Sequence, residues 1–184
     1  MSSEIESLAR AVLSRIHDPH TGADLVASGA VRGVGVDGAR VSVDLVLGYP
    51  AQSWRETLAA DVKQALEADP AIEAAAVSVA CRVFSHQVQK ELSPLREVKN
   101  VIAVASGKGG VGKSTTAVNL ALGLVAEGAK VGVLDADVYG PSLPLLTATA
   151  GKPESPDGQN FLPKRNHGLQ VMSIGYMIDD DTPV

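Results

Sequence analysis

The feature that most constrains this 184-residue chain is a glycine-rich stretch near its middle. Residues 101–105 are a continuous apolar run, which is typical of a strand buried on both faces of a parallel sheet. Gly107 to Ser114 then fits the pattern G-x-x-x-x-G-K-[ST], the phosphate-binding loop that stands between a strand and a helix. Apolar residues recur through 115–127, and Gly128 follows where a helix would end. The sequence therefore predicts a strand, a phosphate-binding loop and a helix in that order.

The residue types of this loop suit a polyphosphate. Inward-facing backbone N–H groups, a helix N-terminus and a lysine ammonium can all meet closely spaced negative charges. We expect Lys113 to reach the β- and γ-phosphates, the Ser114 hydroxyl to bind Mg²⁺, and Thr115 to donate near the α-phosphate. The predicted nucleotide-binding residues are Gly107, Lys108, Gly109, Gly110, Val111, Gly112, Lys113, Ser114 and Thr115. The alternative is a glycine-rich turn before an ordinary helix.

The residues after the loop complete a βαβ unit. Residues 130–134 form the next buried strand, and a right-handed crossover makes the two strands parallel. Ligands bind at the carboxyl ends of such strands, so Asp135 and Asp137 are expected beside the phosphate-binding loop. One carboxylate could hold Mg²⁺ through water and the other could orient an attacking water, although both could simply cap the strand. Residues 147–168 are expected to form an exposed loop, 168–176 a further strand, and the acidic run at 179–181 a solvated loop.

Residues 1–84 predict a separate small α+β domain. The pattern gives a helix over 4–16, strands over 31–36 and 40–47 joined at Asp37-Gly38, a helix to Ala68, and a strand over 75–83. Ser53 with Glu56 three residues later reads as a capping box for the second helix. Cys81 falls in the core-facing row of the last strand, so we expect a buried thiol. We interpret residues 17–22 as a solvated turn rather than a metal site, residues 85–99 as a linker, and 100–184 as the second domain.

Composition excludes several classes of function. The net charge is −5, which argues against a general nucleic-acid-binding surface. The single cysteine allows neither an intrachain disulfide nor a C-x-x-C metal site within these residues. The first residues lack a secretion signal, and no apolar run approaches the length that spans a bilayer. A cytoplasmic protein without membrane or nucleic-acid partners is the expectation.

The loop Gly107-Lys108-Gly109-Gly110-Val111-Gly112-Lys113-Ser114 has a lysine directly after its first glycine. It resembles the deviant Walker A motif of the family that includes nitrogenase iron protein, the arsenite-pump ATPase, MinD and ParA. The resemblance implies an ATP-promoted homodimer in which Lys108 reaches the phosphates on the other subunit. It also implies that Asp137 positions water and that Asp135 supports the metal region, so Lys108, Lys113 and Asp137 form the expected catalytic set. The plain alternative for Lys108 is a solvated loop lysine.

Further motifs narrow the resemblance. Asp18-Pro19-x-Thr21-Gly22 and Leu47-x-Tyr49-Pro50, with the element order of residues 5–84, resemble the MIP18-like domain of iron–sulfur assembly proteins. Residues 135–142, 171–175 and 181–184 are similar to the Mrp/NBP35 group (ApbC-like) of iron–sulfur cluster carrier ATPases. The resemblance implies a carrier that binds ATP and Mg²⁺, hydrolyses ATP, and transfers a [4Fe–4S] cluster to apo-proteins with the help of assembly factors.

Proteins of that group are about twice as long. Their second half carries a Walker B aspartate and the C-x-x-C cluster ligands, neither of which occurs in this sequence. We therefore expect a C-terminally truncated chain with an incomplete α/β P-loop domain, iron–sulfur ligands outside the chain, and nucleotide binding without efficient hydrolysis. Two alternatives remain open, a MinD/ParA-type positioning ATPase and a non-enzymatic adaptor in cluster assembly.

Overall fold

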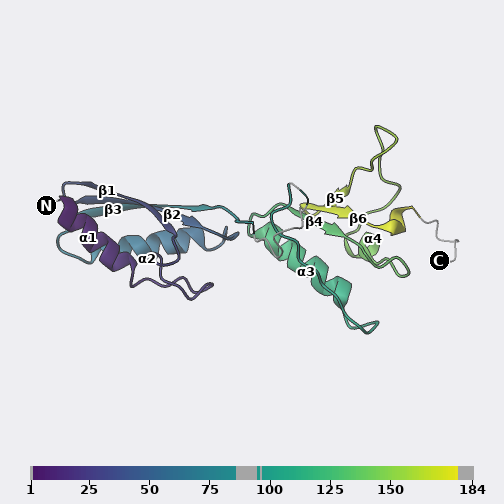
Figure 1. Ribbon diagram of the computed structural model, residues 1–184, viewed down its shortest axis with the longest axis horizontal. Helices are drawn as coiled ribbons and strands as arrows, with labels where there is room; N and C mark the ends of the chain where they lie inside the picture. Colours follow the sequence, from purple (N-terminus) through teal and green to yellow (C-terminus); the bar gives the residue numbers. More distant parts are fainter. Residues whose placement is uncertain (1, 86–94, 96, 178–184) are drawn as a thin grey trace. The chain divides into compact units, whose positions relative to one another are not determined.

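The computed structural model describes residues 2–85, 95 and 97–177 (Figure 1). It divides into two compact units, residues 1–100 and residues 101–184. Most of the predicted linker and the acidic run at 179–181 lie outside the described residues. Among the residues described, no helix combines the length and apolar character needed to cross a membrane.

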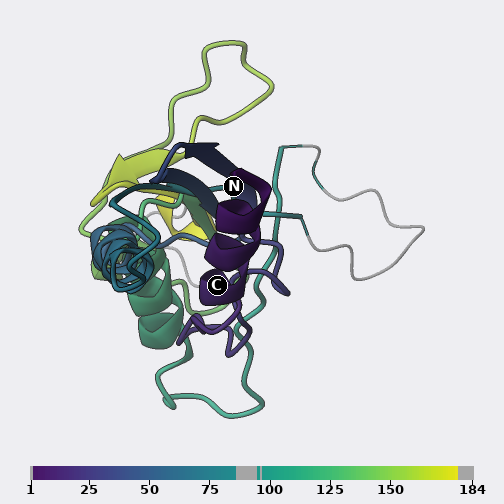
Figure 2. The ribbon, with the colours of Figure 1, turned by 90° about the vertical axis from the view of Figure 1, so that its left-hand side faces the viewer.

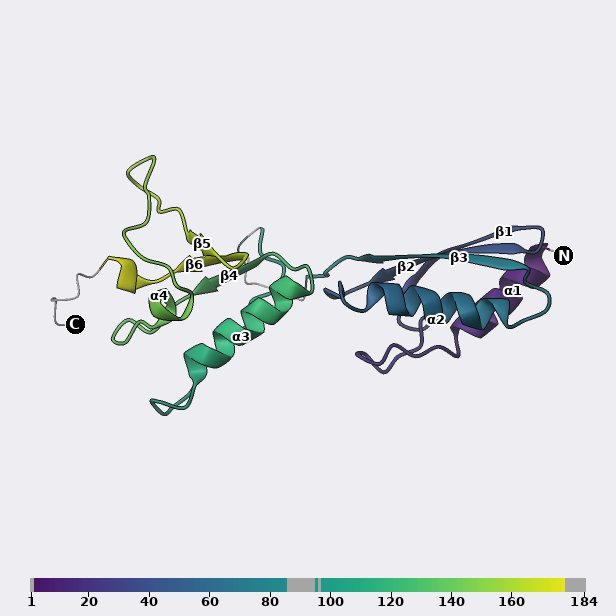
Figure 3. The same ribbon diagram turned by 180° about the vertical axis from the view of Figure 1, so that it is seen from behind.

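The first unit has the predicted α-β-β-α-β order. Its elements are α1 (Ser2–Leu13), β1 (Val31–Asp37), β2 (Arg40–Leu47), α2 (Arg55–Glu67) and β3 (Ala74–Cys81). Strands β1 and β2 pair as an antiparallel hairpin, and α2 crosses over so that β3 pairs with β2 in parallel. Both helices lie on the same side of the three-stranded sheet (Figure 3). The predicted small two-layer domain is therefore confirmed.

Periodicity explains the core of this unit. Alternate residues of β2 are buried, and they meet positions of α2 spaced four residues apart, which is the spacing of one helix face. The buried residues of these two elements are Val41, Val43, Leu45, Leu47, Leu58, Val62 and Leu66. The N-cap of α2 is Trp54, one residue later than the predicted Ser53, and the Trp54 side chain makes no capping hydrogen bond. The Ala51 carbonyl accepts from the Trp54 and Arg55 N–H groups, which places Ser53 inside the preceding turn.

The prediction of a buried thiol at Cys81 is wrong, and one side chain of the predicted solvated turn is buried. Cys81 is exposed, because β3 is the edge strand and burial of its helix-facing row declines from Ala75 toward Cys81. In the turn at 17–22, residues 17 and 19–22 are exposed as predicted, whereas Asp18 is only 3% exposed. Its carboxylate accepts hydrogen bonds from the Tyr49 hydroxyl at 2.6 Å and from the His20 N–H at 2.9 Å, so the turn is tied to the end of β2. In the described part of the chain, no group of three or more His, Cys, Asp or Glu side chains is arranged to hold a metal ion.

The second unit contains a small mixed sheet. Its elements are α3 (Lys113–Ala126), β4 (Val131–Leu134), α4 (Leu143–Leu146), β5 (Lys164–Asn166), β6 (Leu169–Met172) and the 3₁₀ turn η1 (Ile174–Tyr176). The strand order is β4-β6-β5, with β4 and β6 parallel and β5 antiparallel to β6. Residues from α3, α4, β6 and η1 form the core, namely Val118, Ala121, Leu143, Leu169, Val171 and Tyr176. The parallel sheet of the prediction is thus partly present.

The strand predicted at 101–105 is absent. These residues have no regular secondary structure, and Val101 and Ile102 are 72% and 60% exposed. A strand needs a neighbour to pair its backbone N–H and C=O groups. The sheet of this unit consists of β4, β6 and β5, so residues 101–105 have no place in its ladder.

One strand was missed. The segment predicted as an exposed loop, 147–168, ends in β5, which pairs with β6 through a two-residue turn at His167 and Gly168. Both turn residues have positive φ, 50° and 77°, as the tight hairpin turns require. Gly168 is also needed for space, since a Cβ there would lie 2.7 Å from Val125 Cγ1 of α3. The earlier part of the segment is a loop that projects away from the sheet (Figure 2).

Candidate nucleotide-binding site

The glycine-rich loop leads directly into α3. Residues 107–112 are turns and bends, and Gly112 is the N-cap of the helix. Gly110 and Gly112 have φ of 73° and 85°, a region that residues with a Cβ seldom adopt. A Cβ built at any glycine of the loop would meet nothing within 4 Å, so the loop faces open space. The glycines of the loop therefore leave open space before the N-terminus of α3, an end of a helix at which backbone N–H groups can meet an anion.

Lys113 is the first residue of α3, and it is not free. Its Nζ donates to Asp137 Oδ2 at 2.9 Å, and the two side chains are 31% and 37% exposed. The hydrogen bond and the charge of Lys113 lower the pKa of Asp137, and the Gly140 N–H lowers it further. The structure thus brings the predicted phosphate-binding lysine and the predicted water-positioning aspartate into direct contact.

Asp135 follows β4 and organises the loop after it. Its Oδ2 accepts from the N–H groups of Ser142 and Leu143 at 3.1 and 3.2 Å, and from the Ser173 hydroxyl at 3.1 Å. Its Oδ1 accepts from the Asp137 N–H at 3.1 Å. Three donors fill Oδ2, whereas Oδ1 with one donor keeps a lone pair. Oδ1 is therefore the oxygen of Asp135 with remaining capacity to accept a further hydrogen bond.

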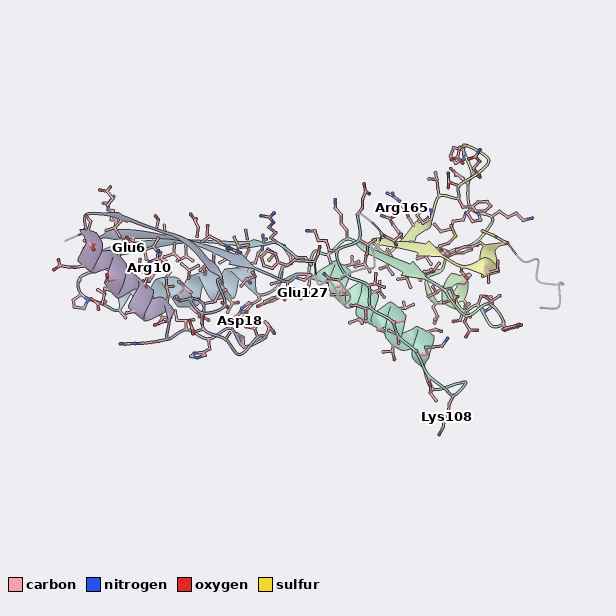
Figure 4. All side chains as sticks on the ribbon, viewed as in Figure 1. Glu6, Arg10, Asp18, Lys108, Glu127 and Arg165 are labelled. Atoms are coloured by element: carbon pink, nitrogen blue, oxygen red, sulfur yellow. The ribbon has the colours of Figure 1, made fainter. Side chains whose placement is uncertain are left out.

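The other predicted residues lie around this pair. Ser114 and Thr115 stand in the first turn of α3, with Ser114 partly buried and Thr115 exposed. Lys108 lies at the exposed tip of the loop beyond the start of α3, and Glu127 marks the opposite end of that helix (Figure 4). The Lys108 N–H donates to the Ser106 hydroxyl at 3.2 Å. The loop thus presents Lys108 outward while Lys113 faces Asp137.

Sequence reasoning missed Ser173. This residue directly follows β6, its side chain is 1% exposed, and it reaches the carboxylate of Asp135. The rule that carboxyl ends of parallel strands share one edge would have found it, had β6 been assigned as the neighbour of β4.

Both halves of the chain match known protein families. Residues 97–184 match the model of the NUBPL iron-transfer P-loop NTPases, and residues 7–79 match that of an iron–sulfur cluster assembly protein. The iron–sulfur cluster carrier protein of a Synechocystis species is 40% identical over 177 residues, which cover 94% of this chain and 50% of the relative. The iron–sulfur cluster carrier protein of Escherichia coli K12 is 66% identical over 85 residues, covering 46% of this chain and 23% of the relative.

This chain therefore spans half or less of the length of these curated relatives. A solved domain of unknown function from Bacillus anthracis aligns with 43% of this chain and 76% of its own, at 23% identity and a TM-score of 0.40. That score is too low to support an argument about the fold.

Proposed function

We propose, on the premise that residues 97–184 belong to the NUBPL iron-transfer P-loop NTPases and residues 7–79 to the iron–sulfur cluster assembly proteins, that this protein is an ATP-binding carrier of iron–sulfur clusters. One observation carries the nucleotide half of the proposal. A glycine loop with two positive-φ residues opens α3 and sets Lys113 against Asp137. The carrier half is supported by the names of the relatives, which are described as iron–sulfur cluster carriers.

In the proposed nucleotide site, residues of the second unit would bind the phosphates, hold Mg²⁺ and position the attacking water. Backbone N–H groups of 107–112 and the N-terminus of α3 would hold the phosphates, with Lys113 at the β- and γ-phosphates. Ser114 would hold Mg²⁺ directly and Asp135 would hold it through water, and the ion would neutralise phosphate charge. Asp137, released from Lys113, would orient a water in line with the γ-phosphate, which is the arrangement that hydrolysis requires.

The cluster is the cargo of this proposed activity. We propose a [4Fe–4S] cluster shared by two subunits of a homodimer, with Lys108 reaching across to the partner's nucleotide and with apo-proteins as the recipients. The first unit would meet assembly factors, because its family is defined by that process. A cytoplasmic location stays a prediction.

Substitution of Lys113 by alanine tests the nucleotide site. Charge-assisted hydrogen bonds contribute about 1.5–3 kcal/mol each, so we expect Lys113→Ala to weaken ADP binding roughly ten- to hundredfold. The measurement is titration calorimetry on the 184-residue chain. Lys130→Ala is the matched control, since Lys130 is exposed and precedes β4 away from the loop. Equal affinity of wild type and Lys113→Ala would rule out the phosphate-binding assignment.

The same variant tests the carrier activity. A cluster-loaded protein that includes the remaining part present in the relatives should transfer its cluster to an apo-protein, and transfer should depend on ATP. Lys113→Ala should abolish the ATP dependence, which iron–sulfur absorbance of the recipient would report. ATP-independent transfer by both proteins would contradict a role for the nucleotide.

A further inference from the structure

We infer that the ion pair between Lys113 and Asp137 is a latch that occupies the phosphate-binding lysine, and that a nucleotide must displace Asp137 in order to bind. This inference rests on the proposed nucleotide site, and it adds a regulatory contact to it. It begins from the distance of 2.9 Å between Lys113 Nζ and Asp137 Oδ2. The ammonium group that would bind phosphate is already neutralised by a carboxylate.

Hydrogen bonds made by Asp137 hold the latch in place. Its Oδ1 accepts from the Gly140 N–H at 3.2 Å, and its own N–H donates to Asp135 Oδ1 at 3.1 Å. These two bonds fix the carboxylate within a local turn and leave Oδ2 facing Lys113. These hydrogen bonds with backbone N–H groups therefore hold the Asp137 carboxylate toward Lys113 and restrict the rotation of its side chain.

An arriving nucleotide would compete with this arrangement in two ways. The phosphates need the Lys113 ammonium, and they carry the same sign of charge as Asp137. The carboxylate and the phosphate therefore cannot both stay close to Lys113 at low cost. Displacement of Asp137 relieves the repulsion and also frees the group that would position water.

The segment next to Asp137 is suited to move. Val138 and Tyr139 are 51% and 86% exposed, so displacing them would uncover little apolar surface. The far end of the segment is anchored, because Asp135 Oδ2 also accepts from Ser142 and Leu143. Residues 138–141 can therefore rearrange between two points that Asp135 holds, which would couple nucleotide binding to the conformation of this exposed loop.

Removal of the latch should strengthen nucleotide binding. When the binding-competent state is only partly populated, the apparent affinity falls by that fraction, and a substitution that favours this state restores it. Exposed ion pairs shift equilibria by small factors, so Asp137→Asn should lower the Kd for ADP roughly three- to fivefold. Asparagine keeps an oxygen for the Gly140 N–H and suits the turn. Asp137→Ser is a second neutral variant, in case the amide perturbs folding.

A control separates the latch from general effects. Glu154→Gln removes one exposed negative charge elsewhere in the unit, so it should bind ADP as the wild type does. Calorimetric titration of ADP into the 184-residue chain gives all the values, with circular dichroism as the check of folding. Tighter binding by both neutral variants, with no gain in Glu154→Gln, is the expected result.

Three outcomes would overturn the inference. Unchanged or weaker binding by the neutral variants would show that Asp137 does not compete with phosphate, while the loss caused by Lys113→Ala would still support the nucleotide site. An equal gain from Glu154→Gln would assign the effect to net charge alone. Absence of ADP binding by the wild type and all variants would remove the proposed nucleotide site and the latch together.

Discussion

Asp135 and Asp137 are separated by one residue, yet their surroundings give them different tasks. Asp135 is saturated at Oδ2 by the loop and by Ser173, which makes it an organiser of the strand ends. Asp137 exposes one oxygen to Lys113 and keeps the other for its own turn. The assignment of one carboxylate to the metal region and one to the attacking water stays a prediction.

In the first unit, Tyr49 and Asp18 form a side-chain hydrogen bond at a partly buried position. The Tyr49 hydroxyl donates to the nearly buried Asp18 carboxylate at 2.6 Å. Burial first, and then the hydrogen bond to Asp18, raise the pKa of Tyr49 well above its ordinary value. The folded state therefore favours the neutral hydroxyl.

We expect Tyr49→Phe to lower the free energy of unfolding by about 1–3 kcal/mol, because it leaves a buried carboxylate oxygen without its donor. Urea unfolding followed by tryptophan fluorescence measures this, since Trp54 is the single tryptophan and it packs against the core of that unit. Tyr139→Phe, at an 86% exposed position, is the matched control and should have little effect.

The effect should depend on pH with a definite sign. The raised pKa of Tyr49 means that its contribution is complete below about pH 10 and is lost as the pH rises further, because the unfolded chain releases that proton first. The difference between wild type and Tyr49→Phe should therefore shrink above pH 10. A difference that stays constant to pH 11 would contradict this account.

At the scale of elements, α3 and β6 form the stable part of the second unit, whereas the apolar run at 101–105 is not part of it. Val171 of β6 is 0% exposed and Val101 is 72% exposed, although both were expected in strands and only the strand at 101–105 was expected to be buried. Because both residues are valines, the same substitution at each position compares the stability contributed by the two segments.

Val171→Ala should cost about 2 kcal/mol, through lost apolar burial and the cavity that remains. Val101→Ala should change stability by less than about 0.5 kcal/mol, as exposed substitutions do. Hydrogen exchange of the α3 and β6 amides, measured by mass spectrometry, reads out both variants. Equal costs would show that residues 101–105 are packed into the core of the protein in solution.

At the scale of the whole molecule, the chain joins two units, one that matches an iron–sulfur cluster assembly family and one that matches an iron-transfer P-loop NTPase family. It spans half or less of the length of the carrier proteins that it resembles, so the activity of the complete protein is a proposal. Lys108 is the residue of this chain on which the proposed homodimer depends. It stands at the exposed tip of the loop, beyond the start of its own helix α3 (Figure 4).

We expect Lys108→Ala to abolish nucleotide-dependent dimerisation while it leaves the affinity of each chain for ADP within about twofold. An exposed lysine that contacted the partner's phosphates would act only in the dimer, whereas Lys113 would act in each chain. Sedimentation velocity with a non-hydrolysable ATP analogue measures the dimer, with Lys130→Ala as the matched control. Dimers of normal stability in Lys108→Ala would disprove the proposed action across the interface.

Features that depend on neighbouring residues could be predicted from the sequence. The glycine loop, the start and end of α3, the alternation of β2 and the order of elements in the first unit depend on neighbouring residues, and the structure agrees with them. The hairpin turn at His167 and Gly168 was also local, and it was overlooked.

The sequence placed Asp135 and Asp137 beside the phosphate-binding loop, but only the tertiary structure decided which atoms of distant residues meet. The contacts Lys113–Asp137, Asp135–Ser173 and Asp18–Tyr49 join residues 24, 38 and 31 positions apart, and periodicity alone does not specify such pairs. Likewise the apolar run at 101–105 has the composition of a strand, but composition cannot supply a neighbouring strand. Backbone conformation follows from local chemistry, whereas pairing and burial depend on what else is folded beside each segment.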